Sequence, residues 1–150
     1  MSDTERLRLN VSAVAIDERA LVLTGKPGSG KSTLALELID RGAVLIGDDG
    51  VTASARAGTP YAAPPQEQRG SVEIRGVGLI TLPVTEAPVA LILALDEAPE
   101  RLPEVLAQED WAGLAVPQLP FDSSAPAAAL RAEYALRKFG LDASTDADFS

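Results

Sequence analysis

The stretch with the clearest chemistry is GKPGSGKST, residues 25–33, which fits the pattern G-x-x-x-x-G-K-[ST]. Its glycines allow a backbone turn in which amide N–H groups face inward and surround phosphate oxygens. The Lys31 ammonium would lie over the β- and γ-phosphates of a nucleotide, and the Ser32 hydroxyl would join the shell of a bound Mg²⁺. We therefore expect the whole stretch to bind nucleotide phosphates: Gly25, Lys26, Pro27, Gly28, Ser29, Gly30, Lys31, Ser32 and Thr33.

The flanking sequence supports this interpretation. Residues 20–23 (ALVL) form a short apolar run typical of a strand, and the glycines follow at once. Residues 32–41 carry apolar side chains at helical spacing, and Gly42 stands where a helix ends. A strand, a glycine-rich loop and a helix together aim a helix N-terminus at an anion. The alternative is a glycine turn between two core elements with an exposed lysine.

Two adjacent acids, Asp48 and Asp49, follow an apolar run at residues 43–46 that predicts a buried strand. Ligands of open α/β sheets gather at the carboxyl ends of strands, so both acids are expected near the nucleotide. Because side chains alternate in direction along a strand, one acid could hold Mg²⁺ while the other faces an acceptor hydroxyl. The alternative is an ordinary acidic turn that leads into Gly50.

Two further segments are candidates for the same chemistry. Asp96 ends the apolar run at residues 89–95 and imitates a Walker B carboxylate, which competes with the acidic pair for the metal role. As an alternative, residues 96–99 form a polar turn. The segment EIRGVG, which starts at Glu73, has two closely spaced glycines that favour a bulge or a close backbone approach, or a salt-bridged hairpin.

The composition of the chain limits its domain number, its catalytic chemistry and its partners. The 150 residues, 46% of them hydrophobic, predict one globular domain over residues 1–150, with flexible ends at 1–6 and 141–150. There is no cysteine and no histidine, which excludes thiol catalysis, Cys/His zinc sites and histidine acid–base chemistry. A net charge of −9 argues against nucleic acid as a partner. No apolar run reaches membrane-spanning length and residues 1–10 lack a signal-peptide core, so we expect a cytoplasmic protein without membrane contact.

Periodicity predicts an α/β layer fold with a mixed sheet and flanking helices. A first strand region at residues 7–16 is expected to pair with residues 21–23 through a turn at 17–19. Residues 58–70 are expected to form a loop, and Pro117 favours an edge position for a last strand. The remaining expected strands are residues 43–46, 51–55, 72–74, 77–82, 89–95 and 113–119, and the expected helices are 32–41 and 124–139.

The phosphate loop, the acidic pair in VLIGDDGV and the segment SVEIRGVGLI together resemble the catalytic domain of the HPr kinase/phosphorylase family. The likeness covers roughly residues 7–139 and is greatest for the short alphaproteobacterial-type members, which lack an N-terminal domain. It implies a P-loop fold like that of phosphoenolpyruvate carboxykinase. It also implies phosphorylation of a serine on an HPr-like phosphocarrier by Mg·ATP, reversed by phosphate attack, in regulation of the sugar phosphotransferase system.

The resemblance also implies roles for individual residues. Asp48 would be the general base toward the acceptor serine, with Lys31 as the second catalytic residue. Ser32, Asp49 and Glu73 would hold the metal. Long relatives form hexamers, and the sequence leaves the oligomeric state of this chain open.

One departure from the family pattern leaves alternatives open. Family members carry LHxxxVAI before the phosphate loop, whereas this chain has LNVSAVAI with Asn10 at the histidine position. Asparagine cannot carry a proton or a positive charge. A catalytically weakened nucleotide-binding regulatory module is therefore the second interpretation. A small-metabolite kinase or generic ATPase that uses Asp96 is the third.

Overall fold

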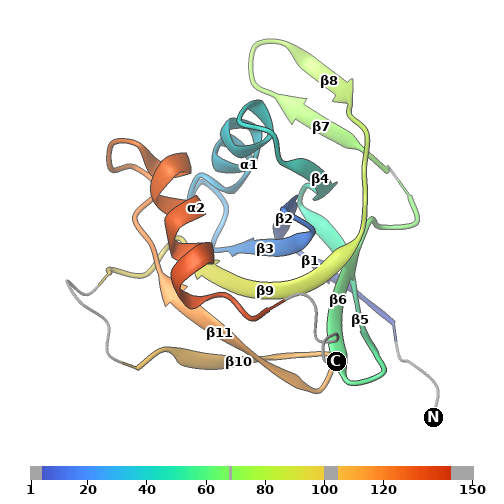
Figure 1. Ribbon diagram of the computed structural model, residues 1–150. Helices are drawn as coiled ribbons and strands as arrows, with labels where there is room; N and C mark the ends of the chain where they lie inside the picture. The colour runs from blue at the N-terminus through green and yellow to red at the C-terminus, as the bar shows by residue number, and fades with distance from the viewer. Residues whose placement is uncertain (1–4, 68, 100–104, 143–150) are drawn as a thin grey trace.

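The computed structural model describes residues 5–67, 69–99 and 105–142, which form eleven strands and two helices. Figure 1 shows them. The strands are β1 (Arg6–Leu9), β2 (Ser12–Ile16), β3 (Arg19–Thr24), β4 (Val44–Gly47), β5 (Gly50–Arg56), β6 (Thr59–Ala63), β7 (Ser71–Ile74), β8 (Gly78–Thr81), β9 (Ala87–Ala94), β10 (Ala107–Trp111) and β11 (Leu114–Pro120), and the helices are α1 (Lys31–Asp40) and α2 (Ala128–Phe139).

Nine of the strands form one mixed, curled sheet with β9 at its centre. β3 runs parallel to β9 and pairs with it along one edge, whereas β6 and then β11 pair with β9 elsewhere along its length. β2 is antiparallel to both β3 and β4, so β3, β4 and β9 all point the same way. The carboxyl ends of these three strands therefore lie at one end of the sheet.

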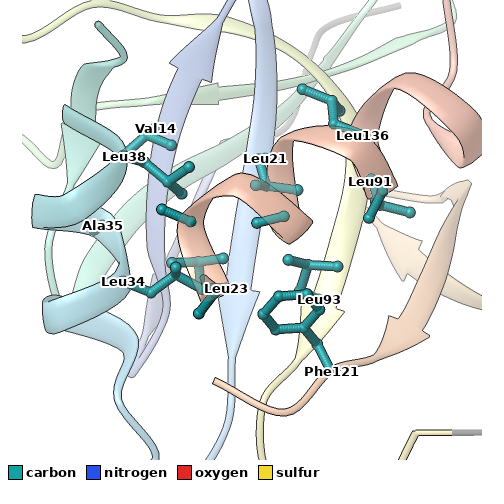
Figure 2. Packing of buried hydrophobic residues seen from close by; sticks show 14 of the residues in the cluster. Val14, Leu21, Leu23, Leu34, Ala35, Leu38, Leu91, Leu93, Phe121 and Leu136 are labelled. Carbon is teal, nitrogen blue, oxygen red and sulfur yellow. The ribbon is translucent and has the colours of Figure 1, made fainter. Parts of the chain in front are cut away.

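Two hydrophobic cores cover the two faces of this sheet. Alternate side chains of β3 and β9, such as Leu21, Leu23 and Leu93, pack against α1 and α2 (Figure 2). The intervening residues, such as Val22 and Ile92, face the second core, which the curled strands close around Trp111. Because both faces are buried, β3 and β9 are continuous apolar runs, as the sequence predicts.

β7 and β8 form a separate two-stranded hairpin that stands away from the main sheet on the side of α1 (Figure 1). The hairpin turns at residues 75–77, which confirms the break predicted between the two short strands. The predicted turn between the first strand region and β3 is also confirmed, because β2 and β3 pair as a hairpin through Asp17 and Glu18. The helix predicted at residues 32–41 corresponds to α1.

Four predictions about elements were wrong. The region at residues 7–16 is not one strand paired with β3, because β2 pairs with β3 whereas β1 pairs with β5. Residues 58–70 are not all loop, because β6 occupies part of them, and its Pro60 lies just outside the two residues that pair with β9. β11 is not an edge strand, because β10 covers its other side, and Pro117 precedes the stretch paired with β9. The second helix begins at Ala128 instead of residue 124, because Pro126 disfavours helical backbone before it and Ala127 is left-handed with φ 58°.

α2 packs against the sheet mainly through small side chains. Its buried residues are Ala128, Ala129, Ala132, Ala135 and Leu136, whereas Leu130 and Tyr134 are 40% and 57% exposed. Small side chains let α2 approach the sheet closely.

The chain ends are described in part. Residues 1–4 and 143–150, most of the ends expected to be flexible, lie outside the described residues. Arg6 pairs with Ala53 at the start of β1, and the Leu141 N–H donates to the Ala90 carbonyl at 3.0 Å. No helix in the described ranges is long and apolar enough to cross a membrane.

Candidate active site

The glycine-rich loop connects the carboxyl end of β3 to the first turn of α1. Gly25, Gly28 and Gly30 have φ of 146°, 87° and 99°, a backbone region that other residues rarely adopt. Leu34 donates the first helical hydrogen bond, to the Gly30 carbonyl at 3.0 Å. The N–H groups of the first turn thus have no partner within the helix, and no acidic side chain lies in that turn. The loop and helix together form a site suited to an anion.

Lys31 lies inside this loop. Its side chain is 9% exposed, and its Nζ donates to the carbonyls of Gly25 at 2.6 Å and Lys26 at 3.1 Å. These bonds close the loop into a ring around the ammonium group. They satisfy a cation that would be costly to bury without partners.

Asp48 contacts the start of the same helix. Its Oδ1 accepts the Ser32 hydroxyl at 2.8 Å and the Ser12 hydroxyl at 2.9 Å. The topology explains the contact, because β4 carries Asp48 to the end of the sheet where β3 delivers Ser32 and where β2, which lies between them, begins with Ser12. The half-buried carboxylate of Asp48 therefore faces the Ser32 hydroxyl, which can also serve as a ligand of a metal ion.

Asp49 points differently from its neighbour, as the sequence predicts for adjacent acids. It is exposed, has a left-handed backbone with φ 64°, and lines the same cleft as the loop. Its carbonyl accepts the N–H of Asn10 at 3.2 Å. Asn10 is itself left-handed with φ 64° and exposed, a conformation that asparagine adopts more readily than most residues. The residue at the expected histidine position therefore borders the acidic pair.

A cleft of about 970 Å³ joins the loop, Asp49 and the β7–β8 hairpin. Glu73, on β7, lines this cleft and is exposed. The predicted metal residues Ser32, Asp49 and Glu73 thus share one cleft. Within the described ranges no three side chains of the Asp, Glu, His or Cys type come close enough to form a metal site. The carboxylate that contacts Ser32 is that of Asp48.

Asp96 lies on the other side of the loop. Its Oδ2 accepts the backbone N–H of Lys26 at 3.2 Å, and its side chain is exposed. It also lies close to Gly25, where an added Cβ would come within 3.5 Å of the Asp96 nitrogen. Asp96 therefore supports the loop backbone, whereas Asp48 contacts a side chain of the helix.

The family-model comparison decides the family. The model of the HPr Serine kinase C-terminal domain matches residues 4–85, more than half of the chain. The chain belongs to this family. The expected resemblance is therefore confirmed, and the matched residues include the loop, the acidic pair and the whole β7–β8 hairpin.

Individual relatives agree with this assignment. The HPr kinase/phosphorylase of Clostridium botulinum (strain Eklund 17B) is 41% identical over 73 residues, 49% of this chain and 24% of that protein. That of Clostridium tetani is 38% identical over 76 residues, 51% of this chain and 25% of that protein. The matched segment thus spans about a quarter of these curated relatives.

A solved structure shares the fold. The Hpr(Ser) kinase/phosphatase from Coxiella burnetii matches with a TM-score of 0.76 and 24% identity, over 88% of both chains. The match confirms a mixed α/β fold with a curled sheet and two helices.

The donor groups of this site fit a nucleotide phosphate and a magnesium ion. The N–H groups of the first turn of α1, which have no partner within the helix, suit phosphate oxygens. Ser32 and Asp48 bring a hydroxyl and a carboxylate within 2.8 Å of each other, both of which are oxygen ligands of the kind Mg²⁺ takes.

Sequence reasoning missed two residues of this site. Ser12 is fully buried and contacts Asp48, and the only signal was a polar residue inside an apolar strand. Ser123 donates its hydroxyl to the Ser29 carbonyl at 2.7 Å and comes from the segment after β11. Nothing local in the sequence indicates that this segment reaches the loop.

Proposed function

We propose that this chain transfers the γ-phosphoryl group of ATP to a serine of an HPr-like phosphocarrier protein, and so regulates the phosphotransferase system. The glycine-rich loop is the P-loop of a nucleotide-binding fold like that of phosphoenolpyruvate carboxykinase. ATP as the donor favours a cytoplasmic location. The observation that carries the proposal is the Ser32–Asp48 contact of 2.8 Å at the start of α1, where Ser32 lines the same cleft as the glycine-rich loop.

The residues of the cleft have different roles in phosphate binding and metal binding. The loop backbone and the first N–H groups of α1 bind and orient the phosphates, and Lys31 adds positive charge beside them. Ser32 is the first candidate to hold Mg²⁺, with Asp49 and Glu73 in the same cleft. When bound, Mg²⁺ neutralises negative charge that develops on the phosphoryl oxygens.

Asp48 acts as the general base toward the acceptor serine. The acceptor serine hydroxyl attacks the γ-phosphorus, the bond from that phosphorus to the bridging oxygen breaks, ADP leaves, and the serine proton passes to the Asp48 carboxylate. In the reverse direction an oxygen of inorganic phosphate attacks the phosphorus of the phosphoserine, the bond from that phosphorus to the serine oxygen breaks, pyrophosphate forms, and Asp48 returns the proton to the serine oxygen. The protein contributes position and charge, with no covalent intermediate.

The test combines the protein with Mg·ATP and a purified HPr-type carrier, and follows the intact mass of the carrier. We expect the carrier to gain one phosphoryl group, located on a serine by fragmentation. Nucleotide binding is measured in the same preparation by calorimetry. If nucleotide binds and the carrier mass stays unchanged, the proposed function is wrong.

A second candidate is a nucleotide-binding regulatory module with little turnover. It is favoured by Asn10, which borders the acidic pair and cannot exchange a proton. This candidate predicts nucleotide-dependent binding of the carrier without phosphorylation. It fails if Asp48→Asn removes a measurable transfer activity while nucleotide binding persists.

A further inference from the structure

Ser12 is a fully buried hydroxyl at the floor of the cleft. It is the first residue of β2, has an exposed fraction of 0%, and lies between the buried residues Val11 and Ala13. A buried polar group is expected to have hydrogen-bond partners, because an unpaired one is costly. Both partners of Ser12 belong to the acidic pair.

The Ser12 hydroxyl connects the side chain of one acid to the backbone of the other. It donates its proton to Asp48 Oδ1 at 2.9 Å and accepts the Asp49 N–H at 3.4 Å. A serine hydroxyl has a single proton, so the direction of both bonds follows from the chemistry of the partners. One side chain thus restrains both acids.

On the basis of the proposed function, we infer that Ser12 is the positioning residue of the phosphoryl-transfer reaction. Asp48 Oδ1 has two lone pairs, and the hydroxyls of Ser12 and Ser32 occupy them. Within the described residues Oδ2 accepts no side-chain hydrogen bond, and it is therefore the oxygen available to take the proton of the acceptor serine. Anchoring one oxygen fixes the direction of the other.

The same hydroxyl stabilises the unusual backbone of Asp49. A residue other than glycine is strained at φ 64°, so a partner for its N–H helps to keep it there. This conformation separates the two acid side chains, with Asp48 toward Ser32 and Asp49 exposed at the cleft wall.

Ser12 suits this role better than Ser32 does. It pairs with Leu23 of β3, and the next residue of its strand, Ala13, pairs with Gly47 of β4, so its backbone belongs to the sheet. Ser32 is less buried and lies in the first turn of α1, where its hydroxyl also faces the phosphate site. We therefore expect the bond from Ser12 to persist when the cleft is occupied.

The experiment compares three variants of the full chain. Ser12→Ala removes only the hydroxyl, and Ser12→Thr restores it. Ser54→Ala is the matched control, because Ser54 is 1% exposed in β5 and its Oγ has no partner among the described residues. The measurements are kcat and KM for ATP with an HPr-type carrier, and the NMR signals of the Asp49 amide and the Asp48 carboxyl carbon.

We expect Ser12→Ala to lower kcat by roughly 10- to 100-fold with KM for ATP nearly unchanged, because misplacement of a reacting group costs about that much. It should also shift both NMR signals and speed the hydrogen exchange of the Asp49 amide. Ser12→Thr should recover most of kcat, and Ser54→Ala should change neither rate nor signals.

The inference is overturned if Ser12→Ala leaves kcat and both NMR signals as they are, or if it acts through KM alone. It is also overturned if Ser54→Ala lowers kcat as much, because the effect would then reflect any buried hydroxyl. If the wild-type chain transfers no phosphoryl group, the proposed function fails. The restraint on the acidic pair is then decided by the two NMR signals.

Discussion

Asp48 and Asp96 flank the glycine-rich loop from two sides, and each follows a strand that runs parallel to β3. They differ in what they contact. Asp48 is half-buried and accepts two serine hydroxyls, whereas Asp96 is exposed and accepts the backbone N–H of Lys26. Strand direction alone would make the two acids equivalent candidates for the metal role.

The difference shows that the partner of an acid, more than its place in the topology, indicates its role. The β4 flank, defined by Asp48, Ser12 and Ser32, joins side chains that can bind a ligand or move a proton. The β9 flank, defined by Asp96, Ser123 and the backbone of residues 25–30, joins groups that hold the loop in shape. The β4 flank is therefore expected to affect chemistry and the β9 flank stability.

The largest contrast is expected between Asp48→Asn and Asp96→Asn. Loss of the base at Asp48 should lower the rate of carrier phosphorylation by roughly 10²- to 10⁴-fold. Asp96→Asn should change it by less than about threefold, because an amide oxygen can still accept the Lys26 N–H. Asp110→Asn, an exposed acid on β10, controls for loss of charge. A larger loss for Asp96→Asn than for Asp48→Asn would support the ATPase interpretation instead.

A second contrast concerns the hydroxyl of Ser32. Ser32→Ala removes a ligand candidate and should weaken Mg²⁺-dependent nucleotide binding by about tenfold or more, by analogy with the loss of groups that orient a metal. Ser32→Thr keeps the hydroxyl and should bind nearly as the wild type. Calorimetry with and without Mg²⁺ separates the metal effect from phosphate binding. Equal affinity of Ser32→Ala and wild type in Mg²⁺ would exclude Ser32 as a ligand.

Local features of this fold could be predicted from the sequence. The loop from Gly25 to α1 depends on glycines and helical periodicity within a few residues, and the β7–β8 turn depends on Gly76. Strands β3 and β9 are apolar runs because both of their faces are buried. The identity and approximate place of Asp48 and Asp49 also followed from the strand before them.

Long-range features could not be predicted in the same way. β10 (AQEDW) is mostly polar and exposed, and it is held by pairing with β11, so its own sequence carries little strand signal. The contact of Ser12 with Asp48 requires β2 to lie between β3 and β4. No local sequence pattern indicates this strand order. The support of Ser29 by Ser123 spans 94 residues of chain.

A third contrast lies within the loop, between Gly30→Ala and Gly28→Ala. Both glycines have positive φ, so alanine costs about 1–2 kcal/mol of folding stability at either position. At Gly30 the new Cβ would also lie 2.8 Å from Ser123 Oγ, whereas at Gly28 it meets nothing within 4 Å. Gly30→Ala should therefore be the less stable variant, by roughly 1 kcal/mol, as its Ser123–Ser29 bond is disturbed. Denaturant unfolding measures both, and equal stabilities would contradict the support that the β9 flank gives the loop.

The smallest effect on stability is expected at the ion pair that joins α2 to the end of α1. Arg41 donates two hydrogen bonds to the Glu133 carboxylate, both 2.9 Å, and this bonding lowers the pKa of Glu133 from its ordinary value of 4.5. A lowered pKa means that the stabilisation is complete above pH 4.5 and is lost as the pH falls through the folded-state value. Glu133→Gln should therefore be slightly less stable than wild type at neutral pH, and the difference should shrink in acid, as followed by thermal unfolding from pH 7 to pH 3.

Glu37→Gln, an exposed glutamate on α1 without a side-chain hydrogen bond among the described residues, is the matched control and should follow the wild-type pH profile. Phosphoryl transfer by Glu133→Gln at neutral pH should equal that of wild type, because Arg41 lies at the carboxyl end of α1, whereas the glycine-rich loop and Ser32 lie at its start. A fall in kcat without a fall in stability would mean that the two flanks are coupled through α1. The separation between a chemical and a structural side of the loop would then be wrong.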